Sequence, residues 1–130
     1  MTQQATLHGE RLFLRPLRAS DAGLVTLYAG DRRVAEMTTS IPHPLPPGAA
    51  EAFVERSLLP GARERVWVMD AAPIEGPELV GLISAEDEGA GVYEMGYWVG
   101  PPFWNTGYAT EALALLADHL LGAGAARLRA

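Results

Sequence analysis

One stretch of the chain constrains the fold more than any other: a strand-like run that leads through a glycine turn into an apolar helix. The run at 93–99 is rich in aromatic and apolar residues, Gly107 lies in the turn, and leucines at helical spacing predict a helix over about 110–121. The first backbone N–H groups of a helix have no partner within it and lie at the positive end of its dipole. The pattern therefore favours a site for a phosphate or pyrophosphate.

The rest of the chain predicts a mixed sheet with helices packed on it. Segments with strand composition lie at 11–17, 65–71, 78–85, 89–99 and 125–130, and helices are predicted at 20–30, 31–37 and 49–59. Short turns between the central strands favour antiparallel pairing, whereas a strand that follows a crossover helix pairs in parallel. We expect Ser20 to cap the first helix and residues 1–9 to form a frayed lead-in.

Length and composition limit the class of protein. A chain of 130 residues suits one domain, over 1–130, and a net charge of −6 argues against nucleic-acid binding. No apolar run is long enough to span a membrane, and the first ten residues lack the apolar core of a signal peptide. The absence of cysteine excludes disulfides and thiolate metal sites. We expect a cytoplasmic protein that binds no metal.

The order of these elements, with the Gly107 turn after the strand of Tyr97 and Trp98, resembles the GNAT superfamily of acyl-CoA-dependent N-acetyltransferases. The similarity is greatest to its ribosomal-protein N-acetyltransferase (RimJ/RimL-like) branch. Three segments carry it: RLFLRPLRASD at 11–21, YEMGYWV at 93–99 and FWNTGYATEAL at 103–113. The resemblance implies an α/β (α+β) fold, in which helices flank a twisted, mainly antiparallel mixed sheet.

The third segment is similar to the acetyl-CoA pyrophosphate motif of that family. Gly107 and Ala109 match its last two fixed positions, while Trp104 stands at the first, where Gln or Arg is usual. The resemblance therefore implies acetyl-CoA as cosubstrate. The residues whose backbone would hold its pyrophosphate are Asn105, Thr106, Gly107, Tyr108, Ala109 and Thr110. The pantetheine arm would lie along the strand at Trp98 and Val99.

Glu94 is the candidate catalytic residue. It alternates with Met95 along the predicted strand, and so shares a sheet face with Gly96 and Trp98. Only a neutral amine attacks a thioester, so a carboxylate beside the cosubstrate could remove the proton of an ammonium group, directly or through a water. The alternative is a solvated glutamate on the open face of a sheet.

The resemblance implies an enzyme that transfers acetyl to a primary amine, either a protein N-terminus or a small amine, by direct attack in a ternary complex. Family members usually continue with a further strand, helix and strand that supply a general acid. We therefore expect a domain incomplete at its C-terminus, with an open sheet edge beside the Glu94 strand that a homodimer, domain-swapped or not, would cover. The alternatives are a non-catalytic acyl-CoA-binding or assembly module, or an inactive fragment.

Overall fold

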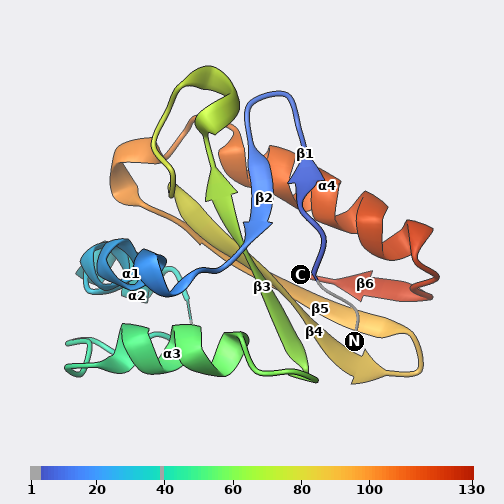
Figure 1. The fold of residues 1–130 in the computed structure, drawn as a ribbon, viewed down its shortest axis with the longest axis horizontal. Helices are drawn as coiled ribbons and strands as arrows, with labels where there is room; N and C mark the ends of the chain where they lie inside the picture. Colours follow the sequence, from blue (N-terminus) through green and yellow to red (C-terminus); the bar gives the residue numbers. More distant parts are fainter. Residues whose placement is uncertain (1–3, 39) are drawn as a thin grey trace.

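A computed structural model describes residues 4–38 and 40–130 and contains a six-stranded sheet whose strands follow the chain order (Figure 1). The strands are β1 (Leu7–His8), β2 (Phe13–Pro16), β3 (Glu64–Asp70), β4 (Gly81–Gly89), β5 (Val92–Val99) and β6 (Arg127–Arg129). Neighbouring strands are antiparallel except β5 and β6, which are parallel. The predicted antiparallel meander and the parallel last strand are both confirmed.

Helices cover both faces of this twisted sheet (Figure 1). They are α1 (Ala22–Ala29), α2 (Arg32–Glu36), α3 (Ala49–Ser57) and α4 (Tyr108–Gly122), with short 3-10 turns η1 (Ala19–Asp21), η2 (Ala72–Ile74) and η3 (Pro101–Phe103). Alternation along β3 separates the two layers. Trp67 packs in one core with Leu116 of α4, while Val68 packs in the other with Val25 of α1 and Val54 of α3.

The N-terminal segment is more ordered than its composition predicts. Residues 1–3 lie outside the described part of the chain, but Leu7 and His8 form β1, which pairs with Leu14 and Phe13 of β2. The ring of His8 also meets the ring of Phe13 edge to face, with the centroids 4.8 Å apart. The prediction of a frayed lead-in is therefore wrong for this strand, because pairing with β2, and not the composition of the segment itself, orders it.

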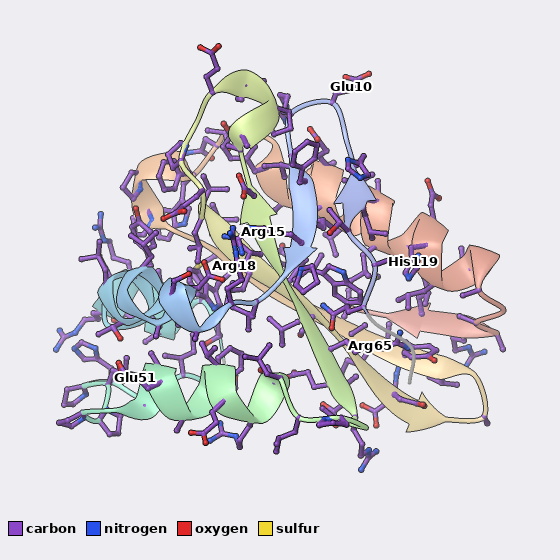
Figure 2. All side chains as sticks on the ribbon, in the orientation of Figure 1. Glu10, Arg15, Arg18, Glu51, Arg65 and His119 are labelled. Atoms are coloured by element: carbon purple, nitrogen blue, oxygen red, sulfur yellow. The ribbon has the colours of Figure 1, made fainter. Side chains whose placement is uncertain are left out.

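The predicted N-cap at Ser20 is also wrong. Asp21 is the N-cap residue of α1 and makes no side-chain cap hydrogen bond to that helix. Its Oδ2 instead accepts a hydrogen bond from the backbone N–H of Arg18, the N-cap of η1, at 2.7 Å. Asp21 is only 2 % exposed. Arg15 compensates for the burial of this carboxylate by donating hydrogen bonds to both of its oxygens, at 3.0 and 2.9 Å. Arg15 also donates through Nε to Asp70 Oδ2 at 2.8 Å, which joins β2, β3 and η1. Figure 2 shows Arg15 and Arg18 close together beside β2.

The edge of the sheet beside Glu94 is partly covered. β6 pairs in parallel with residues 92–94 of β5, so the prediction of an open edge beside the Glu94 strand is wrong for these three residues. Beyond residue 94, β5 continues to Val99 without a strand on that side among the described residues. Within the described part of the chain, the end of β5 therefore pairs with β4 alone. None of the described helices has the length and apolar character needed to cross a membrane.

Candidate active site

The turn between β5 and α4 holds an unusual backbone conformation. Asn105 and Gly107 have φ angles of +62° and +83°, and α4 begins at Tyr108, directly after Gly107. Thr106 Oγ1 donates to the carbonyl of Phe103 at 2.5 Å, which closes the turn on itself. Only glycine adopts the left-handed conformation readily, so Gly107 suits its position, whereas Asn105 is a tolerated exception.

The N-terminus of α4 is open. Gly107 is its N-cap and has no side chain to accept from the first N–H groups of the helix. Thr106 Oγ1 lies 3.5 Å from the Tyr108 nitrogen, at the limit of a hydrogen bond. The N–H groups of the first turn therefore point out of the helix with its positive dipole end behind them, an arrangement that suits an anion.

The end of β5 presents backbone groups toward the side that β6 leaves free. The Gly100 N–H donates to the Val80 carbonyl, on the β4 side, at 2.8 Å, whereas the Val99 carbonyl accepts from Trp104 Nε1 at 2.6 Å. Because successive residues of a strand direct their backbone groups to opposite sides, Tyr97 and Val99 direct theirs away from β4. We call this edge of Tyr97 and Val99 the β5 slot. The backbone of Trp98 faces β4 instead.

One groove of about 1120 Å³ joins the turn and the β5 slot. All the site residues expected from the sequence line it: Glu94, Trp98, Val99, Trp104, Asn105, Thr106, Gly107, Tyr108, Ala109 and Thr110. Helices α1 and α3 and the loop at 40–45 form the opposite wall. The structure thus brings the candidate base and the candidate cofactor turn, which are separate in the sequence, into one cleft.

A row of three glutamates crosses the floor of this groove. The strand registers pair Glu64 with Glu86 and Glu86 with Glu94, so the three side chains share the sheet face that α1 and α3 cover. Burial and the charge of Glu86 raise the pKa of Glu64, although Ser84 and Arg56 act in the opposite direction. Sequence analysis missed Glu64 and Glu86, because only the strand register shows that they neighbour Glu94. Within residues 4–38 and 40–130, no cluster of side chains is arranged to hold a metal ion.

The sequence of residues 11–130 matches the family model described as acetyltransferase (GNAT) domain. This chain belongs to the GNAT acetyltransferase family. The match covers the turn, the β5 slot and the three-glutamate row together. A comparison with curated protein sequences gave no significant match.

Solved GNAT acetyltransferases have the same fold. A GNAT-family acetyltransferase from Bacillus anthracis is 26 % identical, with a TM-score of 0.73 over 88 % of this chain and 65 % of its own. The RimL ribosomal α-N-protein acetyltransferase is 15 % identical, with a TM-score of 0.77 over 93 % of this chain and 67 % of its own. The microcin self-immunity acetyltransferase MccE, solved in complex with acetyl-CoA and AMP, is 15 % identical, with a TM-score of 0.75 over 90 % of this chain and 66 % of its own. This GNAT chain thus spans about two thirds of the length of these proteins.

Proposed function

We propose that this chain transfers an acetyl group from acetyl-CoA to a primary amine, by direct attack in a ternary complex. The observation that carries the proposal is the shared groove, in which the open N-terminus of α4 and the carboxylate of Glu94 face the same space. Membership of the GNAT family supports acetyl transfer as the reaction. The complex of MccE with acetyl-CoA supports the choice of cosubstrate.

The residues present fit acetyl-CoA in two places. The N–H groups of 105–110 would hold its pyrophosphate, because they lead into the N-terminus of α4, whose N-cap Gly107 makes no side-chain hydrogen bond. The β5 slot would hold the pantetheine arm by strand-like hydrogen bonds, with the side chain of Trp98 as a wall of the groove. Bound there, the cosubstrate supplies the thioester. The N–H of Val99 would stabilise the negative charge that develops on the thioester oxygen.

Glu94 would act as the general base. Its side chain is exposed to the groove, where it can take a proton from the acceptor ammonium directly or through a water. Glu64 and Glu86 beside it make the floor of the groove acidic, which favours an acceptor that arrives with a positive charge. A protein N-terminus and a small amine both have this charge, and the likeness to RimL supports the first.

The substitution Glu94→Gln tests the role of the base. It removes the proton acceptor and keeps the size of the side chain, so we expect kcat for acetyl transfer to fall roughly 10²–10⁴-fold. The Kd for acetyl-CoA, measured by calorimetry, should stay the same because Glu94 is not part of the turn proposed to hold the pyrophosphate. The control is Glu86→Gln, which removes the same charge from the neighbouring strand.

Two outcomes would contradict the proposal. Equal losses in Glu94→Gln and Glu86→Gln would show that Glu94 acts through charge alone. Binding of acetyl-CoA without acetyl transfer to any primary amine or N-terminal peptide tested would instead favour a non-catalytic acyl-CoA-binding module.

A further inference from the structure

The hairpin that joins β1 to β2 lies tightly against the first turn of α4. Glu111 of α4 accepts three hydrogen bonds from it: Oε2 from the backbone N–H groups of Arg11 and Leu12 at 2.9 and 3.0 Å, and Oε1 from Arg11 Nε at 3.0 Å. A Cβ atom on Gly9 would lie only 2.6 Å from Glu111 Oε2, so the hairpin can approach this closely because residue 9 is glycine. Figure 2 labels Glu10 on this hairpin.

The guanidinium of Arg11 also contacts the turn that precedes α4. Its Nη1 donates to the carbonyl of Thr106 at 2.7 Å. A Cβ atom on Gly107 would lie 3.1 Å from Nη2, and the guanidinium carbon lies 5.0 Å from the centroid of the Tyr108 ring. Arg11 therefore contacts three consecutive residues, Thr106, Gly107 and Tyr108, on the side where Gly107 has no side chain.

These contacts reach the turn from outside the groove. Arg11 is not among the residues that line the groove, whereas the three turn residues that it touches are. The turn needs support, because Asn105 has a positive φ and no side chain caps α4. Burial alone would raise the pKa of Glu111, but the hydrogen bonds from Arg11 and Leu12 more than compensate and lower it, so Glu111 is a stable anionic anchor for Arg11.

We propose that Arg11, anchored by Glu111, is a positioning residue for acetyl-CoA: it holds the 106–108 turn in the conformation that aims its N–H groups at the pyrophosphate. This inference rests on the proposed function, since it needs acetyl-CoA at the turn. Arg11 acts through the turn and does not touch the reacting atoms. Its effect should therefore fall on the cosubstrate and leave the acceptor amine unaffected.

The test compares Arg11→Ala and Arg11→Lys with wild type and with Arg32→Ala, which removes an exposed arginine of α2 outside the groove. Arg11→Ala should raise the Kd for coenzyme A and the KM for acetyl-CoA roughly tenfold, with the KM for the acceptor unchanged. Arg11→Lys keeps the positive charge but lacks the planar guanidinium that donates to Glu111 and Thr106 together, so its Kd and KM should lie between those of wild type and Arg11→Ala. Arg32→Ala should bind like wild type.

A loss of folding can be distinguished from a loss of positioning. Thermal unfolding of each variant gives its melting temperature, and binding is measured at a temperature at which all variants are folded. Arg11→Lys provides a milder change if Arg11→Ala does not fold. In a double-mutant cycle, Glu111→Gln should add little to Arg11→Ala, because the two residues act as one unit. Wild-type affinity in Arg11→Ala, or equal rises in both KM values, would overturn this inference alone. A wild-type chain that does not bind coenzyme A would overturn the proposed function with it.

Discussion

The cluster around Arg15 and the groove around Glu94 contain similar charged groups in opposite arrangements. In the cluster, Asp21 and Asp70 share one buried cation, with hydrogen bonds of 2.8–3.0 Å. In the groove, three carboxylates lie side by side across three strands, and no ion pair neutralises them among the described residues.

The pKa shifts reflect this difference. Burial would raise the pKa of Asp21, yet the hydrogen bonds from Arg15 and from the Arg18 backbone lower it below its ordinary value. Burial and the neighbouring Glu86 raise the pKa of Glu64. We therefore expect the paired charges of the cluster to stabilise the fold and the carboxylate row of the groove to reduce stability at neutral pH. In the proposed function, that row faces the cationic acceptor.

The largest effect should come from breaking the cluster. Arg15→Met removes the cation and leaves two buried carboxylates without it, which should cost about 3–5 kcal/mol of unfolding free energy. Urea unfolding followed by circular dichroism measures this change. The control is Arg33→Met, which breaks an exposed pair with Asp31 and should change stability little. A change in Arg15→Met as small as in the control would show that the cluster does not stabilise the fold.

The second-largest effect should be on the pH dependence of stability, which the Arg15 cluster controls at acid pH. Because the folded-state pKa of Asp21 is lowered from 3.8, its ionised form stabilises the fold above that pH, and this contribution is lost as the pH falls through the folded pKa. Wild-type stability should therefore drop below about pH 4. In Arg15→Met the trend should reverse, since protonation relieves the buried carboxylates. Parallel stability curves for the two proteins between pH 3 and 6 would contradict the role given to Arg15.

The smallest effect should come from the groove. The folded pKa of Glu64 is raised, so its contribution to stability is greatest at low pH and falls as the pH rises from the unfolded pKa through the folded one. Glu64→Gln should therefore stabilise the protein at neutral pH, by about 0.5 kcal/mol after discounting for solvent screening. The exposed Glu55→Gln on α3 is the control. Glu64→Gln should also raise the KM for a cationic acceptor, because it removes one negative charge from the groove. If Glu64→Gln instead lowered the stability at pH 7, the ionised Glu64 would not be destabilising the fold.

Most of the fold could be predicted from the sequence because its strands and helices carry strong local patterns. The apolar spacing predicts that the helix after Gly107 begins at about 110, whereas α4 begins at Tyr108. The error arises because the start of the helix depends on the left-handed Gly107 and not on the apolar spacing. β1 has only two residues, and its order depends on pairing with β2, so it gave no local pattern.

The candidate site could be predicted only in part. Glu94 and the turn at 104–110 lie in the segments that resemble the GNAT family, and the structure brings them to one groove. The partnership of Arg11 and Glu111 joins residues 100 positions apart, and the three-glutamate row depends on the registers of three strands. Neither has a signal in the sequence alone, because each arises from the close packing of distant segments.

The most direct test of the central claim is the binding of acetyl-CoA to wild type, Thr110→Glu and Ala114→Glu by calorimetry. Thr110 is exposed and lines the groove in the first turn of α4, and Ala114 is exposed one turn further along, outside the groove. A glutamate at 110 suits the helix dipole but places a negative charge where the pyrophosphate would lie. We predict that wild type and Ala114→Glu bind with similar affinity and that Thr110→Glu binds at least roughly tenfold more weakly while remaining folded. Equal binding by all three proteins, or none by wild type, would contradict a cosubstrate site at the start of α4.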